Sequence, residues 1–205
     1  MNYRDYMIDD AYDITTYGVS SEAGAVFHDH IDNHQEMLSE CIAFNDWVQV
    51  EEGYEFWTPS LIKYHIDALV KNDMPRKSSP DKPWDRWFAV PSEHDMPAIY
   101  KFVEDNKHQY KDVLISKLAA GAQIAPHTHS RQKFIYNMSI NSPEGCTFTV
   151  YPTGPIPYKA GDIYKVHTRH THSVKNDSNE DRYHIMLMSV ADMSQFQPKG
   201  KIRLT

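Results

Sequence analysis

The chain has 205 residues, of which 40% are hydrophobic and 24% are charged, and its net charge is −7 with neutral histidines. These values fit one globular domain with a buried core, with or without an extension. The acidic balance disfavours nucleic acids and membrane surfaces as partners, and no apolar run reaches the ~18 residues of a membrane helix.

The first part of the chain, residues 1–110, mixes helix and strand signals, and we expect a mixed α/β extension that packs on a core. Loosely helical spacing of apolar residues predicts a helix within residues 21–43. Beyond it we expect a hairpin, a helix, an exposed loop and a further helix, at residues 47–57, 58–70, 73–83 and 92–103.

The second part, residues 111–195, changes to short strands separated by turns, and residues 196–205 form a C-terminal tail. The predicted strands lie at residues 113–118, 121–126, 134–140, 146–151, 162–166, 172–175 and 182–190. Short strands at such regular spacing predict a β-sandwich or a β-barrel.

The chain has two cysteines, Cys41 and Cys146, which are far apart and form no CxxC motif. We therefore expect neither a disulfide framework nor a zinc ribbon. The first residues include the charged Arg4 and Asp5, and no apolar segment follows them, so we expect no signal peptide and a cytoplasmic location. The oligomeric state stays open, and a homodimer is compatible with the sequence.

Five of the 12 histidines fall in two clusters, namely His127 and His129, and then His167, His170 and His172. Residues two apart on a strand point to the same face, with Cα atoms about 6–7 Å apart, which suits two ligands of one metal ion. A histidine from a second strand would complete the site. Imidazole suits iron, zinc, nickel and copper, so these residues predict a metal but do not select it.

Arg182 lies ten residues after His172, at the start of an apolar segment. A guanidinium buried there is costly unless it meets an anion, and it matches a carboxylate through two parallel N–H bonds. The alternative is an exposed arginine at a strand end, paired with Asp181 or Glu180.

Four segments together match a known pattern: SKLAAGAQIAPHT at 116–128, SPEGC at 142–146, GD at 161–162, and HSVKN at 172–176, followed by Arg182. Through them, residues 113–190 resemble the aspartyl/asparaginyl β-hydroxylase family of Fe(II)/2-oxoglutarate-dependent oxygenases, within the cupin superfamily. The resemblance implies a mainly β fold with flanking helices around a double-stranded β-helix (cupin or jelly-roll) core.

The resemblance also implies roles for individual residues. His127 and His172 would bind Fe(II). Arg182 would bind the distal carboxylate of the co-substrate 2-oxoglutarate together with Ser116, and Tyr136 falls roughly where a second contact is expected. The implied reaction uses 2-oxoglutarate and O2 to hydroxylate an unactivated C–H bond, with His127, His172 and Arg182 as the catalytic residues.

The chain departs from the family at His129, where the family usually has glycine. His129 is therefore a candidate third metal ligand. Two alternatives stay open: a three-histidine cupin dioxygenase, isomerase or lyase that needs no 2-oxoglutarate, and a cupin that binds a ligand without turnover. A metal site without a carboxylate also leaves halogenation as a variant.

The substrate is expected to be an amino acid, a peptide or a related small molecule. Arg131 and Lys133 follow the HxH motif and would favour an acidic substrate if they lie at the pocket mouth; otherwise they form a solvated turn. The aromatic residues Trp84, Trp87 and Phe88 belong either to the core or to a lid over the pocket.

Overall fold

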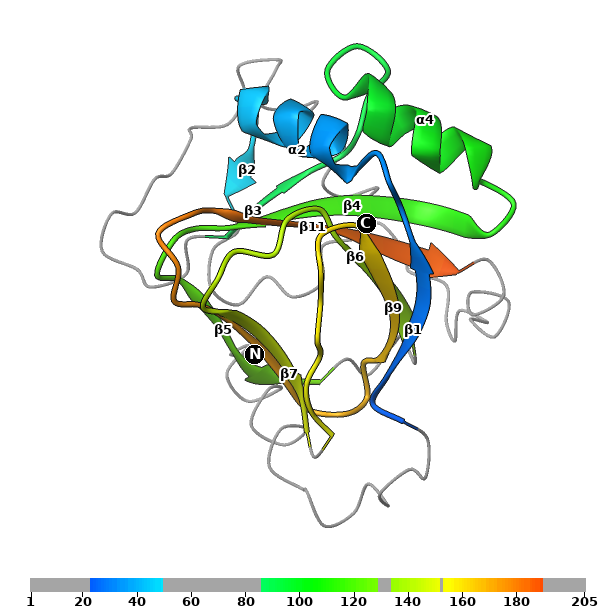
Figure 1. The fold of residues 1–205 in the computed structure, drawn as a ribbon. Coiled ribbons are helices and arrows are strands. Elements are labelled where there is room, and N and C mark those ends of the chain that lie inside the picture. The colour runs from blue at the N-terminus through cyan, green and yellow to red at the C-terminus, as the bar shows by residue number, and fades with distance from the viewer. Residues whose placement is uncertain (1–22, 50–85, 129–133, 152, 190–205) are drawn as a thin grey trace, which may run out of the picture.

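The computed structural model describes residues 23–49, 86–128, 134–151 and 153–189. The described elements include two helices and eleven strands (Figure 1). In chain order they are β1 (Ala25–His30), α2 (His34–Ala43), β2 (Val48–Gln49), β3 (Arg86–Ala89), α4 (Pro97–Asp105), β4 (Tyr110–Leu118), β5 (Gln123–His127), β6 (Phe134–Ser139), β7 (Cys146–Val150), β8 (Gly154–Pro155), β9 (Asp162–His167), β10 (His172–Asn176) and β11 (Arg182–Ser189).

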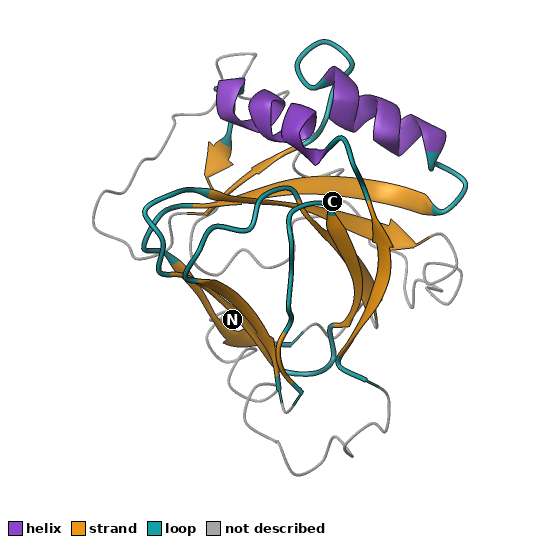
Figure 2. Ribbon diagram, viewed as in Figure 1, coloured by secondary structure: helices purple, strands orange, loops and turns teal. Residues whose placement is uncertain are grey.

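The described strands form two antiparallel sheets that face each other. The larger sheet has the order β1-β9-β6-β11-β4-β3-β2, and the smaller has the order β5-β10-β7-β8. Figure 2 shows the smaller sheet on one side of the larger sheet and the two helices on the other. The mainly β fold with flanking helices and a double-stranded β-helix core is therefore confirmed.

The central strands of the larger sheet send side chains to two different cores, because successive residues of a strand point to opposite faces. Ile185 and Leu187 of β11 pack in a large cluster with Met37 and Ile99 of the helices. A second cluster lies between the sheets and includes Leu118, Ile124, Phe148, Val166 and Val174.

The two helices are joined through one side chain. The carboxylate of Glu40 in α2 accepts hydrogen bonds from the backbone N–H groups of Ala98 and Ile99, at 2.6 and 3.1 Å. Pro97 begins α4, where a missing N–H costs nothing. Neither described helix has the length and apolar character needed to cross a bilayer.

The predicted strands after residue 110 are confirmed within a few residues at each end. The helix predicted within 21–43 is only half right, because residues 25–30 form β1 and the helix begins at His34. Val26 and Phe27 are a β-branched and an aromatic residue, which favour a strand once β9 offers a pairing edge. The helix predicted after Ser92 is present as α4.

Two strands of the N-terminal part were not predicted as they occur. β2 pairs with β3, and β3 pairs in turn with β4. The second half of the predicted hairpin, the helix at 58–70 and the loop at 73–83 lie outside the described residues. The division near residue 110 stays a prediction, although β1, β2 and β3 all belong to the larger sheet.

Candidate metal and co-substrate site

A cavity lies between the two sheets, and both sheets contribute to its lining. Its apolar walls include Ile124, Phe148 and Val174. The polar side chains that line it are Ser116, His127, Asn137, Thr168, His172, Arg182 and His184. The cavity therefore brings together four of the residues singled out in the sequence, namely His127, His172, Arg182 and Ser116.

His127 and His172 lie side by side on the smaller sheet. Their Cα atoms are register partners at one end of the β5–β10 ladder, and their ring centroids are 4.3 Å apart. Such a pair is well placed to hold one metal ion. His129, the candidate third ligand, lies outside the described residues.

A backbone contact orients the ring of His172. Its Nδ1–H donates to the carbonyl oxygen of His170 at 2.9 Å. In a neutral imidazole this bond places the lone pair on Nε2, which is the usual arrangement of a metal-binding histidine held by a backbone carbonyl. The described part of the chain contains no cluster of three or more His, Cys, Asp or Glu side chains able to hold a metal, so the candidate donors among the described residues are the imidazoles of His127 and His172.

The other histidines of the second cluster do not line the cavity. The ring of His167 packs against Phe134 and His170, with centroids 4.8 and 4.5 Å away. Of the three histidines in that cluster, the structure thus brings only His172 to the cavity.

Arg182 is buried on the larger sheet, with 5% of its surface exposed. Its Nη2 donates to Nδ1 of His184 at 2.8 Å, and its guanidinium lies 5.8 Å from the ring centroid of Phe148. Among the described residues, no carboxylate forms an ion pair with it. The alternative of an exposed arginine paired with Asp181 or Glu180 is therefore wrong.

The titratable neighbours of Arg182 supply no negative charge near neutral pH. These neighbours are Cys146 and Tyr158. Burial raises the pKa of the Cys146 thiol and raises the pKa of the Tyr158 hydroxyl strongly, and in both cases this outweighs the nearby guanidinium. Burial also lowers the pKa of Arg182, but a guanidinium stays protonated in proteins. Among the described residues, the buried guanidinium of Arg182 therefore has no negatively charged partner, and an anionic ligand in the cavity would stabilise it.

Ser116 lies on β4 and faces the same cavity. Its Cα is the register partner of His184 on β11, two residues from Arg182, and its side chain is buried. Its hydroxyl is thus on the same wall as the guanidinium.

Tyr136 is not brought to this group. Its ring packs against Tyr110 and His28, with centroids 5.5 and 4.6 Å away, on the helix side of the larger sheet. The next residue, Asn137, lines the cavity instead. Sequence reasoning missed Asn137, His184 and Thr168, although the Arg-x-His spacing at 182–184 indicates a shared strand face.

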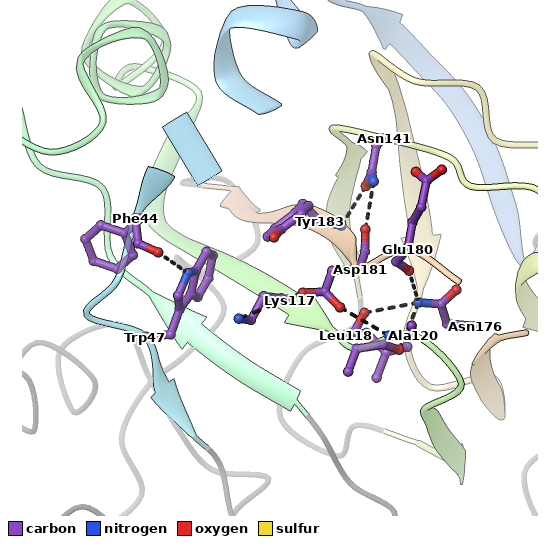
Figure 3. A network of polar contacts seen from close by, with 11 residues as sticks. Phe44, Trp47, Lys117, Leu118, Ala120, Asn141, Asn176, Glu180, Asp181 and Tyr183 are labelled. Atoms are coloured by element: carbon purple, nitrogen blue, oxygen red, sulfur yellow. Dashed lines mark hydrogen bonds and ion pairs between the residues drawn. The ribbon is translucent and has the colours of Figure 1, made fainter. Parts of the chain in front are cut away.

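A polar network holds the turn between β10, which begins at His172, and β11, which begins at Arg182 (Figure 3). The side-chain Nδ2 of Asn176 lies within 2.8–3.1 Å of the carbonyl oxygens of Leu118, Ala119 and Glu180. Asn141 accepts from Tyr183 N–H at 2.7 Å and donates to the Asp181 carbonyl at 2.8 Å.

The family model of the aspartyl/asparaginyl β-hydroxylases matches residues 82–191, more than half of the chain. The chain belongs to the aspartyl/asparaginyl β-hydroxylase family. It is accordingly a 2-oxoglutarate-dependent hydroxylase. The cavity between its two sheets is lined by the polar side chains described above.

Solved structures agree with this hydroxylase in fold. A prolyl hydroxylase from Trichoplax adhaerens, in complex with a hypoxia inducible factor oxygen degradation domain peptide fragment, matches with a TM-score of 0.59 and 13% identity, over 87% of this chain and 88% of that chain.

Two other matches are more partial. A 2OG-Fe(II) oxygenase family oxidoreductase from Burkholderia pseudomallei matches with a TM-score of 0.42 and 14% identity, over 60% of this chain and 75% of that chain. A cupin domain from Bordetella pertussis Tohama I matches with a TM-score of 0.31 and 16% identity, over 38% of this chain and 79% of that chain. No protein with a curated description matches the sequence.

Proposed function

We propose that this hydroxylase binds Fe(II) through His127 and His172 and binds 2-oxoglutarate through Arg182 and Ser116, and that it hydroxylates an amino acid or a peptide. Fe(II) held there would, with O2 and 2-oxoglutarate, supply the oxidant for a C–H bond. One oxygen atom would go to the product and one to succinate, with loss of CO2. The chain's own residues bind the co-substrate, orient it and exclude water.

The observation that carries this proposal is the buried guanidinium of Arg182, which forms no ion pair with a carboxylate among the described residues. A cation at this depth is stabilised only by a counter-charge, and the distal carboxylate of 2-oxoglutarate would supply one. The planar fork of arginine binds both carboxylate oxygens and so fixes the direction of the bound molecule.

The two sides of the cavity have different proposed roles, metal binding on one and co-substrate binding on the other. His127 and His172 come from the smaller sheet, and Arg182 and Ser116 come from the larger sheet opposite. Phe148 lies between them, 5.9 Å from the His172 ring and 5.8 Å from the guanidinium. A dicarboxylic acid spanning this space would rest on an apolar wall, with one polar end at each sheet.

The substrate class rests on the family and on one structural relative. The Trichoplax adhaerens prolyl hydroxylase was solved with a peptide, which supports a peptide or an amino acid as the substrate of this chain. A screen for succinate release across free amino acids and short peptides should identify substrates, because uncoupled turnover sets a low background that a true substrate raises.

Removal of the guanidinium tests the co-substrate site directly. Anaerobic addition of 2-oxoglutarate to the Fe(II)-loaded protein should produce the weak visible metal-to-ligand absorption band. In Arg182→Ala we expect the affinity for 2-oxoglutarate to fall by about 100-fold or more, since a buried charge pair is lost. Fe(II) binding should persist.

The matched control is Lys175→Ala, which removes an exposed cation from β10 that pairs with Asp177. This variant should bind 2-oxoglutarate as the wild type does. No absorption band in the wild type, together with unchanged binding in Arg182→Ala, would contradict the proposal. Oxygen consumption without 2-oxoglutarate would favour the three-histidine cupin alternative.

A further inference from the structure

His184 is a second buried polar group on the wall that carries Arg182. It lies two residues further along β11, lines the same cavity and is 2% exposed. Its Nδ1 receives the hydrogen bond from Nη2 of Arg182 at 2.8 Å. The proposed metal and co-substrate contacts leave this imidazole without a role.

The contact with Arg182 defines the protonation state of His184. A guanidinium only donates hydrogen bonds, so Nδ1 must accept and the proton of the neutral ring is on Nε2. Burial, and then the charge of Arg182, lower the pKa of His184 well below its ordinary value. The ring is therefore neutral, and the pair does not bring two cations together.

The ring of His184 is held in place from other strands. The side-chain Oδ1 of Asn137 on β6 lies against Nδ1. Because Nδ1 already accepts from Arg182 and an amide oxygen cannot donate, we assign this amide the flipped orientation, with Nδ2 toward the ring. The ring also meets the edge of Tyr158, with centroids 5.0 Å apart. The Tyr158 hydroxyl in turn donates to the Asn137 carbonyl at 3.2 Å.

We propose that His184 is a positioning residue that fixes the plane of the Arg182 guanidinium, so that its remaining N–H groups face a distal carboxylate in the cavity. The inference rests on the proposed co-substrate site and explains why that site would prefer 2-oxoglutarate to 2-oxo acids without a distal carboxylate. With one N–H group held by His184, the guanidinium is pre-organised for a carboxylate. A 2-oxo acid with a second carboxylate therefore gains more binding affinity than a 2-oxo acid that lacks it.

Three substitutions of His184 separate positioning from folding. His184→Leu introduces an apolar side chain of moderate size and removes Nδ1, which accepts the hydrogen bond from Arg182. His184→Asn places an amide oxygen where Nδ1 stood, because the two side chains share their geometry up to that atom. His184→Gln places its polar group further out, near the position of Nε2, and so serves as the matched control.

The readout is the KM for 2-oxoglutarate, measured together with kcat and with the KM for the prime substrate, which is the molecule that is hydroxylated. In His184→Leu we expect the KM for 2-oxoglutarate to rise about 10-fold to 100-fold, as for loss of a hydrogen bond to a charged group. We expect kcat at saturation and the prime-substrate KM to change less than about 3-fold. His184→Asn should recover most of the loss, and His184→Gln should not.

Selectivity gives a second readout. The preference for 2-oxoglutarate over 2-oxopentanoate, which has a methyl group in place of the distal carboxylate, should shrink in His184→Leu and return in His184→Asn. A purely structural role would lower kcat and thermal stability in all three variants and leave this preference unchanged, which would overturn the inference. Should His184→Leu fail to fold, the comparison of the Asn and Gln variants decides the question.

The inference and the proposed function fail in different ways. If Arg182→Ala binds 2-oxoglutarate normally, the co-substrate site is wrong. If Arg182→Ala loses binding while all His184 variants keep the wild-type KM and selectivity, only the positioning role is wrong.

Discussion

Arg182 brings a permanent charge into the interior between the two sheets, and its surroundings show how the chain tolerates it. Nη2 is satisfied by a neutral imidazole, and the ring of Phe148 lies nearby. Neither partner neutralises the charge. This setting supports the anion-binding role proposed for Arg182, because apolar side chains of similar volume usually give equal or better stability.

The buried neutral His184 also predicts how stability depends on pH. Its pKa is near 6.5 when unfolded and well below that when folded, so the unfolded chain binds the extra proton. This contribution to stability is complete above about pH 6.5 and is lost as the pH falls toward the folded-state pKa, by about 1.4 kcal/mol per pH unit.

Urea denaturation at pH 7.5, 6.0 and 5.0 measures this effect. His184→Asn should flatten the fall in the unfolding midpoint below pH 6.5, whereas the exposed His108→Asn should not. Equal slopes in His184→Asn and the wild type would contradict the neutral, buried state of this ring.

At the residue scale, the sequence predicts the part of the site that spacing encodes. His127, His172, Arg182 and Ser116 were named through the family resemblance and the motif spacing it rests on, and all line the cavity. Tyr136 fails by one position, because side chains one residue apart on β6 point to opposite faces of the sheet. His184 was missed because its contact with Arg182 becomes apparent only when both side chains are known to be buried in the same cavity.

At the scale of elements, the segment that follows β1 approaches Gly161 closely. Gly161 has φ +87°, and its carbonyl accepts from Ile31 N–H at 2.9 Å. A Cβ at Gly161 would lie 2.5 Å from the Ile31 carbonyl oxygen and 2.9 Å from ring carbons of His30 and His34. Only glycine fits both the backbone conformation and the available space.

Gly161→Ala should therefore destabilise the protein by about 2–3 kcal/mol, through the positive φ and the clash together. Gly121→Ala is the matched comparison, because Gly121 has φ +74° and nothing lies within 4 Å of its Cβ position. That variant should lose about 1–2 kcal/mol. Chemical denaturation of both variants tests this, and equal losses would show that the close approach does not matter.

The helix error at residues 21–43 has a physical origin at this scale. The apolar spacing there fits a helix loosely, but the pairing edge of β9 is far away in the sequence. Tertiary context commonly decides the state of such short segments. The strands after residue 110 were easier to predict, because turn residues such as Gly121, Gly145 and Gly161 separate them.

At the scale of the whole molecule, the larger sheet separates two environments. One face is covered by α2 and α4 and is apolar, and the other faces the cavity and the smaller sheet (Figure 1). The β-class of the fold followed from the number and spacing of the strands. The strand order did not, because the pairing of β2 with β3 and of β1 with β9 depends on contacts distant in the sequence.

Ligand binding should stabilise the whole fold in separable steps. Mn(II), a redox-stable substitute for Fe(II), should raise Tm, and 2-oxoglutarate should raise it further. Saturation at 100 times Kd contributes about 2.7 kcal/mol, which is about 5–10 °C in a domain of this size. Thermal unfolding of the metal-free protein, the Mn(II) form and the ternary form measures each step.

Variants assign each step to its residues. Arg182→Ala should keep the Mn(II) shift and lose the 2-oxoglutarate shift, and His127→Ala should lose both. A 2-oxoglutarate shift that survives in Arg182→Ala would place the co-substrate elsewhere.

The unneutralised charge of Arg182 also bears on how long the protein persists in a cell. A protease cleaves the fraction of molecules that has opened, and this fraction grows when the bound anion is absent. If Arg182 binds 2-oxoglutarate as proposed, cells depleted of 2-oxoglutarate should degrade this hydroxylase faster. Replacement of the guanidinium should abolish that dependence.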